Sequence, residues 1–125
     1  MSISISKTVR GYPKLPYQEM QEDILGKRYE LSLVFVGEKR ALTLNQKYRK
    51  KSYIPNVLSF PLDTMHGEIY IAPQVAKREA AHREMSVRGY VGFLFIHGLL
   101  HLKGHAHGAT MEKAEKRYLA KYGLQ

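Results

Sequence analysis

The feature that most constrains the fold is an uncharged stretch from Gly89 to Leu102, which runs directly into a cluster of histidines. The stretch is too short to span a bilayer and carries glycines, so we interpret it as a helix buried in the core. We predict that this helix covers about Val87 to Lys103. Gly104 follows, and because glycine readily adopts a left-handed backbone conformation, we expect the helix to end there.

The spacing of the histidines predicts a metal site at the end of this helix. His97 and His101 are one helical turn apart, so their imidazoles leave the same face and can converge on one ion. His107 lies beyond the glycine turn and completes the second half of the zinc signature H-E-x-x-H-x-x-G-x-x-H. His105 is a rival for the third position, whereas His66 and His82 are expected to be solvated.

Three neutral imidazoles favour one zinc ion (Zn²⁺), with nickel, copper or cobalt as competitors. Three protein ligands leave a position for a water molecule, which indicates a catalytic rather than a structural ion. Where the zinc signature has a glutamate as general base, this chain has Gly98, which argues against a zinc peptidase. The plain alternative is that these histidines are only core and surface residues of a helix and its cap.

Length and composition are typical of one soluble domain over residues 1–125. The chain has no cysteine, which excludes disulfides and cysteine-ligated zinc and fits a reducing, cytoplasmic location. The N-terminus shows no secretory signal, and we expect no membrane insertion. The net charge of +9 favours polyanionic partners, nucleic acid before an acidic membrane surface.

The remaining patterns predict an α+β fold, a single small domain in which a mixed sheet of about four strands packs with about five helices. We expect strands at Ile3 to Ile5, Tyr29 to Val36, Val57 to Phe60 and Glu68 to Ile71, the third of them ending before Pro61. We expect the other helices at about Leu15 to Leu25, Glu38 to Tyr48, Pro73 to Met85 and Thr110 to Tyr122. The metal site would lie at the end of the central buried helix.

A basic run lies at the end of the predicted helix 38–48 and consists of Lys47, Arg49, Lys50 and Lys51. These residues either complement the helix dipole as solvated charges or face a nucleic acid. The helical pattern alone does not decide between the two interpretations.

Four segments follow one another as LNQKYR (Leu44 to Arg49), NVLSFP (Asn56 to Pro61), GEIYI (Gly67 to Ile71) and HGLLHLKG (His97 to Gly104). In this order they resemble the YbeY family of bacterial ribosomal RNA maturation factors, also described as endoribonucleases. The resemblance runs from about Leu31 to the C-terminus.

The resemblance implies one cytoplasmic α+β metalloprotein domain over residues 1–125, a zinc-dependent endoribonuclease that acts on single-stranded RNA. It implies 3′-end maturation of 16S ribosomal RNA and removal of defective ribosomes, with the small ribosomal subunit and its assembly factors as partners. The family's metal-binding histidines fall on His97, His101 and His107, and its functional arginine falls on Arg49. A guanidinium there would stabilise the negative charge that phosphodiester cleavage builds on the phosphoryl oxygens, which favours an RNA-facing role for the basic run.

The sequence departs from the family before the third histidine, where the family usually has Tyr-Asp and this chain has His105-Ala106. A carboxylate there would orient a ligand imidazole or carry a proton, because such groups commonly fix the tautomer of a metal ligand. One hypothesis is that His105 substitutes as the proton carrier. Because the sequence names no general base, the alternative function is a non-catalytic, zinc-braced assembly factor that binds ribosomal RNA.

Overall fold

The computed structural model of the protein describes residues 3–124, which form four strands and five helices. In chain order these are β1 (Ile3–Lys7), α1 (Tyr17–Leu25), β2 (Glu30–Phe35), α2 (Glu38–Arg49), β3 (Val57–Asp63), β4 (His66–Ile71), α3 (Pro73–His82), α4 (Val87–Lys103) and α5 (Ala109–Lys121). Every predicted element is present, and most bounds shift by only one or two residues. The predicted α+β class is confirmed.

The strands form one mixed sheet in the order β1-β2-β4-β3. β1 and β2 pair in parallel, as do β2 and β4, while β3 runs antiparallel to β4. Successive side chains of a strand point to opposite faces of the sheet. Leu33 and Ile69 therefore face the main core, whereas Val34 and Tyr70 face a smaller apolar cluster on the other side.

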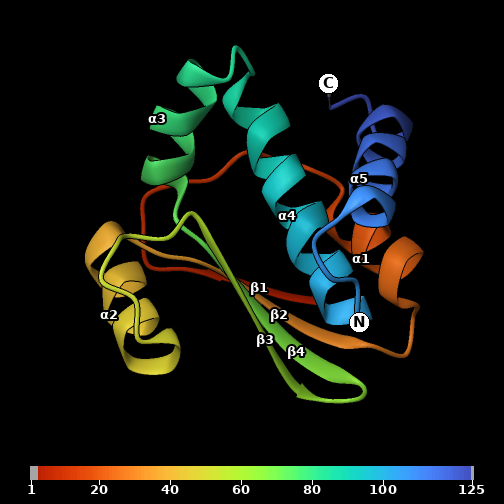
Figure 1. Cartoon of the computed structure of the whole chain (residues 1–125), viewed down its shortest axis with the longest axis horizontal. Helices are drawn as coiled ribbons and strands as arrows, with labels where there is room; N and C mark the ends of the chain where they lie inside the picture. Colours follow the sequence, from red (N-terminus) through yellow and green to blue (C-terminus); the bar gives the residue numbers. More distant parts are fainter. Residues whose placement is uncertain (1–2, 125) are drawn as a thin grey trace.

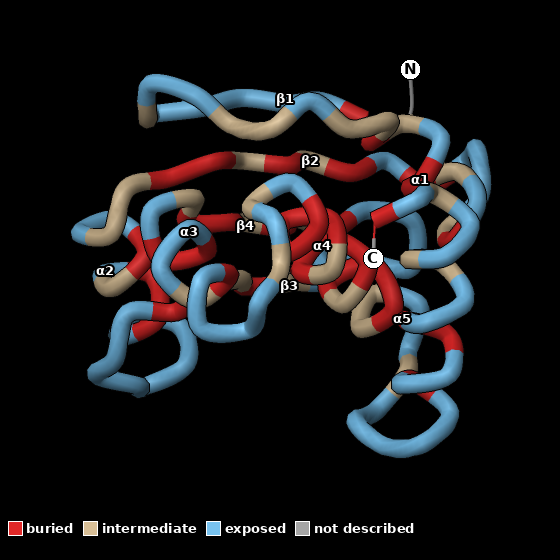
Figure 2. The backbone as a smooth tube through the Cα atoms, turned by 90° about the horizontal axis from the view of Figure 1, so that it is seen from above, coloured by how far each residue is buried: buried red, intermediate tan, exposed pale blue. Residues whose placement is uncertain are grey.

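Helix α4 crosses one face of this sheet and forms the centre of the core (Figure 1). It packs against β3, β4 and the helices α1, α3 and α5, and Figure 2 shows that its backbone is buried along most of its length. Its bounds follow from its two ends: Ser86 Oγ accepts a hydrogen bond from the Gly89 amide at 2.9 Å, and Gly104 has a φ of 106°. No helix in the described part of the chain, α4 included, has both the length and the apolar character needed to cross a membrane.

The predicted end of the third strand before Pro61 is wrong. β3 continues to Asp63, and Pro61 pairs with Gly67 of β4. β3 lies at the edge of the sheet, so a residue without an amide N–H can be accommodated on its unpaired side. The pairing shifts its register only between Pro61 and Asp63. This extension carries Pro61 to the pocket beside the histidines.

Helix α2 packs on the face of the sheet opposite α4, where Ala41 joins Val36, Ala72 and Val75 in the smaller cluster. The helix ends at Arg49, because Lys50 adopts a left-handed conformation with a φ of 57°. This conformation costs a non-glycine residue roughly 1 kcal/mol. It turns the chain back toward β3, so that the residues after α2 border the same pocket as the end of α4.

Candidate metal centre and its pocket

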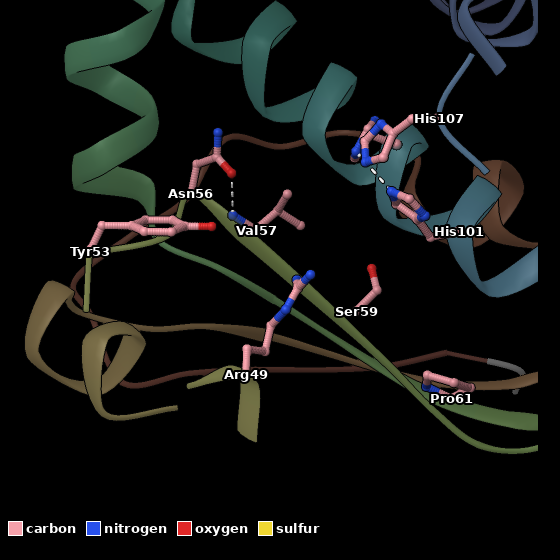
Figure 3. Close-up of a pocket in the computed structure, with 9 residues that line it drawn as sticks. Arg49, Tyr53, Asn56, Val57, Ser59, Pro61, His101 and His107 are labelled. Atoms are coloured by element: carbon pink, nitrogen blue, oxygen red, sulfur yellow. Dashed lines mark hydrogen bonds between the residues drawn. The ribbon is translucent and has the colours of Figure 1, made fainter. Parts of the chain in front are cut away.

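Three imidazoles converge at the C-terminal end of α4; Figure 3 shows two of them, His101 and His107, side by side. His97 and His101 lie on successive turns of α4, and His107 follows the Gly104 turn in the loop before α5. One ring nitrogen of each histidine lies within 4.8 Å of those of the other two. The structure therefore brings together the three histidines that the sequence singled out.

The donor set fits one transition-metal ion. The Nε2 atoms of His97 and His101 are 3.1 Å apart. Two nitrogens bound to a tetrahedral zinc ion at about 2.0 Å would be separated by roughly 3.3 Å, so this pair already has nearly the spacing that an ion requires. Three protein nitrogens also leave a position for a further ligand, as in catalytic zinc sites. The cluster can thus hold a metal ion, while imidazoles alone do not select zinc over nickel or copper.

Burial keeps His101 in the form that binds metal. It lowers the pKa of His101 below the ordinary 6.5, and the neighbouring His97 and His107 lower this pKa further. The charge of Arg49 acts in the same direction. Because metal binds the neutral imidazole, the depressed pKa extends metal binding by His101 toward lower pH.

A buried carboxylate orients the first histidine. Glu115 of α5 is only 7% exposed, and its Oε2 accepts a hydrogen bond from His97 Nδ1 at 2.5 Å. A proton held at Nδ1 leaves Nε2 of the same ring free to bind metal. Glu115 therefore supplies an orienting carboxylate, which Ala106 cannot provide. Sequence reasoning missed it, although a glutamate near the buried Met111 and Ala114 on one helical face was a usable signal.

Replacing Glu115 by glutamine should weaken metal binding by about 10- to 100-fold, the range found when a partner of a ligand imidazole is removed. Glutamine keeps the shape of the side chain but removes the charge that favours the Nδ1 proton. Zinc affinity, measured by competition with a chromophoric chelator, is the readout. Glu112→Gln removes an exposed carboxylate from the same helix and should leave the affinity unchanged. Equal affinities in the native protein and Glu115→Gln would contradict the orienting role.

The histidines border a pocket of about 470 Å³ that also involves α2, the loop after it and β3. In Figure 3, Arg49 and Tyr53 enter from the side of α2, and His101 and His107 lie across from them. Ser59 of β3 lies between the two sides. The lining residues are Arg49, Tyr53, Asn56, Val57, Ser59, Pro61, His97, His101 and His107.

Arg49 is the member of the basic run that lines the pocket. Lys47, Lys50 and Lys51 are exposed and lie outside its lining. The structure thus divides the predicted RNA-binding run into one cation beside the histidines and three on the surrounding surface. A phosphate group in the pocket would meet the guanidinium on one side and the imidazoles on the other.

The other histidines lie apart from the cluster. His105 is not among the three described residues whose ring nitrogens converge, and its amide donates to the Leu100 carbonyl oxygen at 3.0 Å as part of the turn. His66 is exposed and pairs with Asp63 through its Nδ1 at 2.8 Å. His82 is exposed at the end of α3. The geometry therefore favours His107 over His105 as the third ligand.

Gly98 faces the sheet. A Cβ at this position would lie 2.8 Å from Ser59 Oγ and 3.0 Å from Ile69 Cδ1, which is closer than packed atoms normally approach. The Ser59 hydroxyl donates a hydrogen bond to the carbonyl oxygen of Gly98 at 3.3 Å. The absence of a side chain lets β3 and α4 approach each other. The glutamate of a zinc peptidase would have no space here.

Known proteins are similar to this one over most of the chain. The family model described as "Endoribonuclease YbeY" matches residues 4–123. Proteins named endoribonuclease YbeY from Bdellovibrio bacteriovorus, Mesoplasma florum and Allorhizobium ampelinum are 36%, 37% and 38% identical over 78%, 74% and 76% of this chain. These alignments span 64%, 60% and 65% of the relatives, so the chain covers less than two thirds of their length.

A similar fold occurs in a solved structure. The solution structure of a protein from Thermotoga maritima superposes with a TM-score of 0.70 at 28% sequence identity. The superposition covers 96% of this chain and 88% of the other.

Proposed function

Since the chain belongs to the YbeY family, we propose that it is a metal-dependent endoribonuclease that cleaves single-stranded RNA in the pocket of His97, His101 and His107. One observation carries this proposal: a cluster of three imidazoles faces the guanidinium of Arg49 across one pocket. A phosphodiester is an anion that both sides can contact at once. The arrangement therefore suits chemistry at phosphorus.

The proposed substrate is ribosomal RNA, in particular the 3′ end of precursor 16S RNA, and the proposed wider role includes removal of defective ribosomes. The proposed partners are the small ribosomal subunit and its assembly factors, and the proposed location is the cytoplasm. The net charge of +9 supports an RNA partner, because cations that neutralise phosphates supply most of the sequence-independent affinity. We regard residues 1–125 as one YbeY-like metalloprotein domain.

In the proposed mechanism, His97, His101 and His107 hold one ion, for which zinc is the first candidate. When bound, zinc supplies a Lewis acid for a phosphoryl oxygen and lowers the pKa of a coordinated water. Glu115 fixes the ring of His97, and Arg49 stabilises the negative charge that develops on the phosphoryl oxygens. Lys47, Lys50 and Lys51 attract the flanking phosphates from the surrounding surface.

The test is cleavage of one labelled RNA in two forms, single-stranded and annealed to its complement. We expect the zinc-loaded protein to cut the single strand, to lose this activity after chelation and to regain it when zinc returns. Cyclic phosphate ends on the products would identify the neighbouring 2′-hydroxyl as the nucleophile, and their absence would identify water. RNA binding without any cleavage by the zinc-loaded protein would contradict the proposal and leave a non-catalytic assembly factor.

A further inference from the structure

The pocket has an aromatic side that the proposed chemistry does not use. Tyr53 lines it, 59% of the residue is exposed, and the ring extends into the pocket beside Arg49 (Figure 3). Among the described residues, no hydrogen bond or ring contact engages the Tyr53 side chain. A large part of this aromatic ring is therefore available to a ligand that enters the pocket.

The backbone of Tyr53 is nevertheless held firmly. The buried side chain of Asn45 donates from Nδ2 to the Tyr53 carbonyl oxygen at 2.9 Å. The amide of Lys51 donates to the Asn45 carbonyl oxygen at 3.2 Å, which ties the intervening turn to α2. A ring presented from a fixed backbone loses little conformational freedom on binding, because only two side-chain torsions remain to be ordered.

A second tyrosine, in the last turn of α2, provides the contrast. Tyr48 is also 59% exposed, but its ring packs edge-on against Phe60 at 5.6 Å, and Lys47 Nζ lies 5.3 Å from its centre. It lines a different cavity, on the face of the sheet away from the histidines. The two tyrosines are thus equally exposed but differ in their surroundings. The Tyr48 ring has partners and lies outside the pocket, whereas the Tyr53 ring lines the pocket and has no hydrogen-bond or ring partner among the described residues.

We propose that Tyr53 stacks on a nucleobase of single-stranded RNA and so positions the adjoining phosphate between Arg49 and the histidines. The inference rests on the proposed function and adds the group that recognises the base. Aromatic rings stack on every base with little sequence preference, and single strands offer base faces that a duplex conceals. The pocket volume of about 470 Å³ lies in the range of sites that enclose a small ligand. Tyr53 is a binding and positioning residue in this scheme, and no bond is made to it.

The test is the dissociation constant of a short single-stranded RNA, measured by fluorescence anisotropy at fixed salt with chelator-treated protein, so that the proposed cleavage does not consume the RNA. We expect Tyr53→Ala to bind about 5- to 150-fold more weakly, the range that follows from removing one base–aromatic stack. Tyr53→Phe should bind like the native protein, because it keeps the ring. Tyr48→Ala, the matched control, should also bind like the native protein. Gel analysis after each titration checks that the RNA is intact.

A second measurement uses the native protein and altered RNA. Removing the base from one nucleotide at a time should weaken binding at one position, and the same change should add nothing in Tyr53→Ala. Native affinity in Tyr53→Ala, an equal loss in Tyr53→Phe, or an equal loss in Tyr48→Ala would overturn the stacking role while leaving the proposed ribonuclease intact. A native protein that neither binds nor cleaves RNA would overturn the proposed function itself.

Discussion

Replacing His101 by alanine is expected to remove most of the bound metal and to slow RNA cleavage by about 1,000-fold or more. His101 lies next to both other histidines of the cluster. Its Nε2 is 3.1 Å from His97 Nε2, and its ring centre is 4.7 Å from that of His107. Its loss leaves two imidazoles, too few for the three-ligand arrangement of a catalytic zinc site. Metal content per chain and the rate constant for cleavage are the two readouts.

His82→Ala is the control for this variant, because it removes an exposed histidine from α3 outside the pocket. It should keep the metal and the rate of the native protein. A folded His101→Ala protein with one ion per chain and the native rate would contradict the assignment. Such a result would mean that other side chains bind the ion, and His105 would be the first candidate.

Replacing Gly98 by glutamate is expected to destabilise the fold by at least about 3 kcal/mol and to create no peptidase activity. The new Cβ would press on Ser59 Oγ and on Ile69 Cδ1 at the contact between α4 and the sheet, where Gly98 is buried. We expect a fall in melting temperature of roughly 10 °C or more, measured by circular dichroism.

Gly11→Glu is the control, because a Cβ at this exposed position meets no atom within 4 Å. Its melting temperature should stay near that of the native protein. A stable Gly98→Glu protein that hydrolyses peptides would show that position 98 can face the metal site, and it would revive the zinc-peptidase alternative.

The parts of the site that the sequence could predict are those encoded within one local segment. The apolar run and the glycine after it define α4 and its end, and the spacing of His97, His101 and His107 follows from helical geometry and one turn. The bounds of α4 agree with the prediction because Ser86 and Gly104 cap it on both sides.

The parts that could not be predicted depend on contacts between distant segments. Glu115 reaches His97 only because α5 packs against α4. The apolar positions of α5 indicate that Glu115 is buried, but no local pattern names the residue that it meets. Tyr53 joins the pocket through the left-handed turn at Lys50 and the hydrogen bond from Asn45, neither of which leaves a signature in the sequence. Pro61 predicts the end of a strand in the sequence, because no local pattern shows that β3 lies at the edge of the sheet, where a proline is tolerated.

A metal-centred ribonuclease in which Arg49 faces the reacting phosphate is tested by the rate constant for cleavage of a single-stranded RNA that carries the 3′ end of precursor 16S ribosomal RNA. The comparison is between native protein, Arg49→Glu and Lys51→Glu, each loaded with zinc and checked for folding. Lys51→Glu makes the same change of charge outside the pocket. It therefore separates the local role of Arg49 from the general attraction of the basic surface for RNA.

We expect cleavage by the native protein, a decrease of at least about 100-fold in Arg49→Glu, and a much smaller decrease in Lys51→Glu. A smaller effect of raised salt on Arg49→Glu than on the native protein would be expected as well, since one phosphate contact is lost. No cleavage by the zinc-loaded native protein, or equal rates for the native protein and Arg49→Glu, would contradict a metal-centred ribonuclease in which Arg49 faces the reacting phosphate.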